Sequence, residues 1–164
     1  MFLATFAGMQ PIAGGDILGP AFDLVACQRD ERLADAILTD QTSSLDELRA
    51  AGKSLNSART DISMLITLID EAVQERLQQR RHDHRATPIP SVVADPPSHV
   101  PLHTESVGDI AARMAELWEI LYTTDSDRDN HPEAELLAQL CDGYDTLIAD
   151  IESGRRLPPG CDGR

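Results

Sequence analysis

Aromatic residues are scarce in this chain, at 4% of 164 residues. Sheet proteins draw much of their core from aromatic and β-branched side chains. With so few aromatics, the core has to be built from leucine, isoleucine and alanine, which favours helices packed on helices over a β-sandwich. The chain is long enough to bury a modest core in one domain or two small ones.

The local motifs of common catalytic sites are also absent. The sequence has no glycine-framed serine or cysteine and no glycine-rich phosphate loop. Its three cysteines, Cys27, Cys141 and Cys161, are far apart and form no C-x-x-C pair. This usage is typical of free thiols in a reducing compartment. We therefore expect no enzymatic activity, no cofactor and no structural metal.

Long hydrophobic runs and early positive charges are missing too. The segment 1–12 is apolar, but Gly8 and Pro11 interrupt it, and no lysine or arginine precedes Arg29. A secretory signal normally begins with positive charge, and no stretch has the roughly 20 apolar residues that cross a membrane. The sequence therefore predicts a cytoplasmic protein whose residues 1–20 form a flexible apolar tail, docked on the bundle or on a partner.

The chain has few positively charged residues. The formal net charge is -14, and such a field repels phosphate, so we expect no direct binding to nucleic acid or to an anionic membrane. The charge permits basic partners. It is also compatible with a second hypothesis, an acidic mimic of nucleic acid that inhibits a DNA- or RNA-binding protein by filling its basic groove.

The sequence does contain a long proline-free helical pattern, residues 44–79. Ser44 and Glu47 have the spacing of a capping box at its start. Its apolar residues advance by alternating steps of three and four, the spacing of a helix packed lengthwise against other helices. This seam consists of Leu48, Ala51, Leu55, Ala58, Ile62, Leu65, Ile69 and Ala72.

We expect the seam to join two copies of the chain as a homodimer. One chain of this size cannot easily cover a rod of roughly 54 Å. The small alanines would let a partner helix approach closely. The residues predicted to make the self-association contact are Leu48, Leu55, Ile62, Leu65, Ile66, Ile69 and Val73.

Three shorter helical patterns accompany this segment. The first begins near Pro20 and carries a one-sided apolar pattern of Phe22, Val25, Ala26, Leu33, Ala36 and Ile37. The second and third, 105–122 and 132–153, each show one apolar face, and a polar connection makes them an antiparallel hairpin. Between the hairpins, 86–103 holds five of the ten prolines and reads as a linker or as a proline-rich ligand for a partner's groove.

These patterns predict an all-α fold. We expect an elongated bundle of two helical hairpins around one coiled-coil-like helix of roughly 36–40 residues. The expected division is an apolar tail (1–20), a hairpin with the long helix (21–85), a proline-rich linker (86–103), a second hairpin (104–154) and a loose end (155–164).

Two charged clusters are candidate ligand sites. The first is a group of arginines that either binds an anion or an acidic partner surface, or only stabilises the negative end of the helix dipole. It consists of Arg76, Arg80, Arg81 and Arg85. The second is a segment that resembles the first six positions of an EF-hand calcium loop. Its candidate ligands are Asp125, Asp127 and Asp129. The family's glycine and its bidentate glutamate are replaced by Asn130 and Leu136, which favours an ordinary acidic turn.

A zinc site is a further alternative, which the spacing does not support. It would need His82 and His84 together with His99 and His103, yet residues two apart on a helix point to different sides. The sequence is best interpreted as a noncatalytic adaptor, chaperone or regulator that binds itself and another protein.

Overall fold

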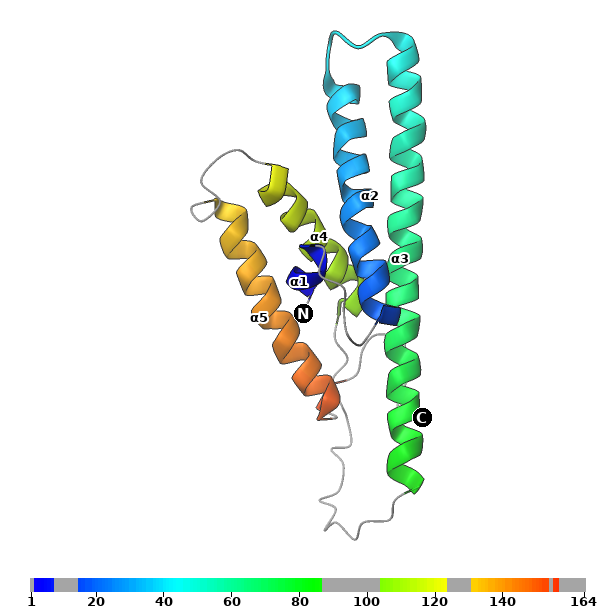
Figure 1. The fold of residues 1–164 in the computed structure, drawn as a ribbon, viewed down its shortest axis with the longest axis vertical. Coiled ribbons are helices and arrows are strands. Elements are labelled where there is room, and N and C mark those ends of the chain that lie inside the picture. Colours follow the sequence, from blue (N-terminus) through cyan, green and yellow to red (C-terminus); the bar gives the residue numbers. More distant parts are fainter. Residues whose placement is uncertain (1, 8–14, 87–103, 124–130, 154, 157–164) are drawn as a thin grey trace.

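The structure, a computed structural model, describes residues 2–7, 15–86, 104–123, 131–153, 155 and 156. Within these ranges the chain is an all-α bundle without strands, so the predicted fold class is confirmed. Its helices pack against one another (Figure 1) and are α1 (Phe2–Phe6), α2 (Gly15–Thr39), α3 (Leu45–Ala86), α4 (Val107–Thr123) and α5 (Pro132–Glu152).

The long predicted helix is confirmed as α3, with 42 residues and a length of roughly 63 Å. It begins with the predicted capping box: the Ser44 backbone N–H donates to Glu47 Oε2 at 2.7 Å, and the Glu47 N–H donates to Ser44 Oγ at 3.3 Å. Hydrogen bonds from Ser44 lower the pKa of the Glu47 carboxyl. These bonds satisfy two backbone donors that a helix start leaves free.

A tight turn folds α2 back along α3. Asp40 Oδ1 accepts hydrogen bonds from the Thr42 backbone N–H at 2.9 Å and from Thr42 Oγ1 at 2.8 Å. These bonds lower the pKa of Asp40. In Figure 1 the two helices run side by side from this turn, with α3 extending well past the start of α2.

Helix α4 crosses α3 at a glycine. The Gly108 backbone N–H donates to Asp70 Oδ1 at 2.8 Å. A Cβ at position 108 would lie only 2.5 Å from the backbone oxygen of Ile66. The crossing therefore places α4 against both α2 and α3, and the core gathers there, with Leu24, Ile69 and Met114 almost fully buried.

The second predicted hairpin is also confirmed. Among the contacts between described helices, α5 packs chiefly on α4. Its predicted apolar face is used: Leu137, Leu147 and Ile151 are buried, and Leu140 and Tyr144 are partly buried. His131 occupies the N-cap position, but its side chain makes no cap hydrogen bond.

The start of α2 differs from the prediction. The helix begins at Gly15, so Pro20 lies inside it rather than at its first turn. Proline has no N–H, so the hydrogen bond to the carbonyl four residues earlier is missing. This missing bond lies close to the start of the helix. The described part of the apolar tail, residues 2–7, docks on the bundle, where Phe6 is buried.

No helix within the described ranges combines the length and apolar character needed to cross a membrane.

Candidate partner-binding surface on α2

Helix α2 uses two of its faces to pack and leaves a third open. The residues facing α3 and α4 are buried: Leu18, Ala21, Leu24, Val25, Gln28 and Ala34. The open face carries Phe22, Leu33 and Ile37, which are 47%, 59% and 40% exposed. Steps of eleven and four residues bring these side chains to nearly the same angle on a helix, and exposed Ala26 lies between them.

This finding corrects the predicted packing of residues 21–38. Of the apolar residues that the sequence pattern grouped as one core face, only Val25 is buried, whereas Phe22, Ala26, Leu33, Ala36 and Ile37 are exposed. The physical reason is that α2 packs on α3 with one face and on α4 with another. Apart from Val25, the residues that α2 buries against α3 and α4 do not belong to the predicted apolar face. Apolar side chains therefore occur on all sides of this helix.

An aromatic groove adjoins one end of the open face. Four of the chain's six aromatic side chains line it, in a hollow of about 460 Å³ bounded by Phe6, Ala7, Phe22, Val25, Ala26, Arg29, Trp118 and Tyr122. The rings of Phe6 and Trp118 are 6.2 Å apart and tilted, and those of Trp118 and Tyr122 are 6.5 Å apart and stacked. Trp118 packs against the core and also lines this groove.

An ion pair between a half-exposed arginine and a buried glutamate fixes the wall of the groove. Arg29 Nε and Nη2 donate to the two carboxylate oxygens of Glu119 at 3.1 Å each. Glu119 is only 1% exposed, whereas the side chain of Arg29 is 49% exposed. The hydrogen bond and opposite charge of Glu119 raise the pKa of Arg29. The guanidinium thus holds α4 to α2 while remaining on the rim of the groove.

The groove ends where α4 ends, but the open face continues. Arg32 Nη1 donates to Thr123 Oγ1 at 2.6 Å, and Thr123 is the last residue of α4. Leu33 and Ile37 follow after this point, where α2 has α3 beside it but no longer α4 (Figure 1). From Phe22 to Ile37 the open face is roughly 22 Å long.

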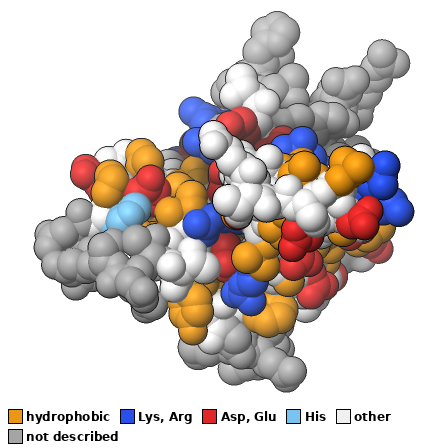
Figure 2. Space-filling view, turned by 90° about the horizontal axis from the view of Figure 1, so that it is seen from above, with side chains coloured by type: hydrophobic (Ala, Val, Ile, Leu, Met, Phe, Trp, Pro, Cys, Tyr) orange, Lys and Arg blue, Asp and Glu red, His pale blue; other side chains and the backbone are white. Residues whose placement is uncertain are grey.

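Carboxylates border the open face on its α3 side. Asp23 and Asp30 are exposed on α2, and they and Asp61 of α3 are close enough to Cys27 to act on its thiol. Burial raises the pKa of the Cys27 thiol, and the charges of Asp61, Asp30 and Asp23 raise it further. Viewed from the end that carries the α2–α3 turn (Figure 2), hydrophobic side chains reach the surface among acidic and basic ones.

The residues predicted for self-association lie along the inner side of α3. Leu65, Ile69 and Val73 are buried in the core, and the remaining four, Leu48, Leu55, Ile62 and Ile66, are partly buried. Helices of the same chain therefore cover this seam. Buried Ala51 and Ala58 provide the predicted small layers, and they lie in the half of α3 that runs beside α2 (Figure 1).

The predicted arginine patch is only partly covered by the described residues. Arg76 pairs with Asp16 of α2, through Nε to Oδ2 at 2.9 Å and through a second, shorter bond from Nη2 to Oδ1. Arg80 is exposed and also has an interaction partner. The side chains of Arg81 and Arg85 lie outside the described residues. Arg76 thus ties the start of α2 to α3.

The predicted calcium residues Asp125, Asp127 and Asp129 lie outside the described residues, as do His99 and His103. In the part of the chain that the structure describes, no group of three or more histidines, cysteines, aspartates or glutamates has a geometry able to hold a metal ion.

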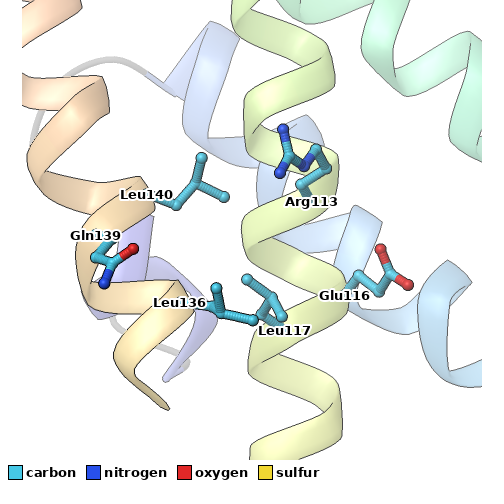
Figure 3. Close-up of a pocket in the computed structure, with 6 residues that line it drawn as sticks. All are labelled: Arg113, Glu116, Leu117, Leu136, Gln139 and Leu140. Atoms are coloured by element: carbon cyan, nitrogen blue, oxygen red, sulfur yellow. The ribbon is translucent and has the colours of Figure 1, made fainter. Parts of the chain in front are cut away.

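A second hollow lies between α4 and α5. It measures about 410 Å³ and is lined by Arg113, Glu116, Leu117, Leu136, Gln139 and Leu140. Figure 3 shows Leu117 and Leu136 facing each other across it. Arg113 is paired with Glu105 at 2.8 Å, and the remaining lining groups are an amide, a carboxylate and leucines. This combination provides no nucleophile with an adjacent base.

Comparison with known proteins finds no match: no family model fits the sequence, and no curated protein or solved structure is significantly similar to it.

Proposed function

We propose that this protein is a noncatalytic adaptor, chaperone or regulator that binds a helix of another protein along the open face of α2. The observation that supports the proposal is the apolar face of Phe22, Leu33 and Ile37, left exposed although α2 already packs on two sides. Exposed apolar surface continuous with a groove is typical of interaction sites. A helix laid in an apolar groove is a recurring mode of recognition.

The groove and the hairpin provide different contacts for such a helix. At the groove, Trp118 and Tyr122 form one wall and Phe22 the other, so an inserted aliphatic or aromatic anchor would contact rings on both sides. Past the end of α4, the bound helix would cover Leu33 and Ile37, in the way that α4 covers α2 nearer its start. Fully burying a side chain of this size contributes about 1.5–3 kcal/mol, and these partly covered residues would give the lower part of that range.

Charge favours a basic partner helix. Asp23 and Asp30 border the open face, and the whole chain carries -14. Complementary charge speeds association and disfavours acidic competitors. The described cysteines, Cys27 and Cys141, are free thiols, which supports a reducing compartment as the place where the protein acts.

The test is capture of partners from a lysate of the source cell, with a photo-crosslinking residue at Ala26. We expect a crosslinked partner whose yield falls when Leu33→Ser and Ile37→Ser are combined. Loss of about 1.5 kcal/mol per residue corresponds to roughly tenfold weaker binding for each. The matched control is Leu136→Ser on α5, which removes another half-exposed leucine and should leave the yield unchanged. Equal yields from the double variant and the unmodified protein would contradict the proposal.

A further inference from the structure

A second surface, independent of α2, lies on the outer side of α3, opposite the seam. We define the outer strip by six exposed residues in steps of four and seven: Arg49, Lys53, Thr60, Met64, Glu71 and Glu75. Steps of four and seven keep residues on one face of a helix. In Figure 1 no described helix covers the side of α3 turned away from α2.

The centre of the outer strip is uncharged and partly apolar. Met64 is 54% exposed, and Leu68 at the strip's edge is 44% exposed. Thr60 and Met64, together with Arg59, Ser63 and Thr67, line a shallow hollow of about 480 Å³. The chain has 28 acidic residues, but none of the residues that line this hollow is acidic.

The charges at the two ends of the strip have opposite signs. Arg49 and Lys53 lie on the N-terminal side of the centre, and Glu71 and Glu75 on the C-terminal side. Among the described residues Lys53 and Glu71 make no ion pair within the chain, and Arg49 makes only an exposed one with Asp46, at 3.4 Å. An ion pair that exposed contributes little to stability, so these charges are available to a partner.

The spacing of the strip is symmetric about position 62. Thr60 and Met64 are equally distant from that position, as are Lys53 and Glu71, and also Arg49 and Glu75. Turning a second copy of α3 end for end therefore places Lys53 opposite Glu71 and Arg49 opposite Glu75, at both ends. A two-fold symmetric contact requires this kind of self-complementary patch. A parallel arrangement would instead place like charges together.

We propose that a second copy of this chain docks antiparallel on the outer strip of α3, with Lys53 and Arg49 of each copy facing Glu71 and Glu75 of the other. The dimer leaves the inner seam to each chain's own core and leaves the open face of α2 free. At about 0.1 M salt the screening length is about 10 Å. Repulsion between the remote parts of two acidic chains is therefore damped, while charges in contact still attract.

The test exchanges the charges and measures mass by sedimentation velocity at about 0.1 M salt. One variant combines Arg49→Glu with Lys53→Glu, and the other combines Glu71→Lys with Glu75→Lys. We expect the unmodified chain to dimerise. Each variant alone should dimerise at least about tenfold more weakly, because like charges then meet at both ends. An equimolar mixture of the two variants should recover the dimer, because opposite charges meet again.

Matched controls change the same charges elsewhere. Arg155→Glu with Arg156→Glu matches the first variant, and Asp142→Lys with Asp145→Lys on α5 matches the second; both controls should dimerise as the unmodified chain does. A circular-dichroism melt of each variant checks that it is folded. The proposal is overturned if the unmodified chain is monomeric, if the strip variants dimerise normally, if the controls lose the dimer equally, or if the folded mixture stays monomeric. Binding of another protein at α2 is tested separately by the Leu33→Ser and Ile37→Ser double variant.

Discussion

At the scale of single residues, Glu119 decides how α4 sits on α2. It is the one charged side chain that is fully buried among the described residues, and Arg29 supplies a hydrogen bond to each of its oxygens. A buried carboxylate without such a partner is costly because it loses its hydration. The pair joins residues 90 positions apart in the sequence, so no local pattern could have predicted it.

Removing the arginine should therefore destabilise the fold. We expect Arg29→Ala to lower the free energy of unfolding by about 1–3 kcal/mol, because Glu119 stays buried without its donor. Adding Glu119→Gln to this variant should recover part of the loss, since a neutral amide costs less to bury than a carboxylate. Urea unfolding at pH 7 measures both. If the single and double variants were equally stable, the burial of the carboxylate would not be the cause.

At the scale of elements, the crossing of α4 over α3 depends on the absence of a side chain at Gly108. We expect Gly108→Ala to destabilise the protein by about 1–3 kcal/mol, because its Cβ would meet the Ile66 backbone and the two helices would have to move apart. Gly143→Ala on α5 is the matched control. Nothing lies within 4 Å of a Cβ there, so this change should stabilise the protein by about 0.5–1 kcal/mol. Thermal melts of both variants give the comparison, and equal effects would rule out the close crossing.

The elements themselves could be predicted from the sequence, because their signals are local. Alternating steps of three and four predicted α3, and the spacing of Ser44 and Glu47 predicted its first turn. The face that α2 buries could not be predicted in this way. Its apolar residues lie on several sides, and which of them are covered depends on where α3 and α4 approach. Likewise, no local pattern could have predicted that Arg76 pairs with Asp16, 60 positions earlier.

At the scale of the whole molecule, stability should be unevenly distributed. Helices α2, α3 and α4 pack against one another around the shared core, whereas α5 packs chiefly on α4 and leaves Leu136 half exposed. A helix with fewer buried neighbours opens at lower free energy than the global unfolding reaction. We therefore expect the backbone amides of α5 to exchange with deuterium faster than those of residues 65–73 in α3, 21–28 in α2 and 110–115 in α4. Hydrogen exchange followed by mass spectrometry measures this order. Equal protection of α5 and α4 would show that they open as one unit. If α5 exchanges fastest, it can move while the groove between α2 and α4 stays intact. The Arg29–Glu119 pair and the close contact at Gly108 both join helices that exchange slowly.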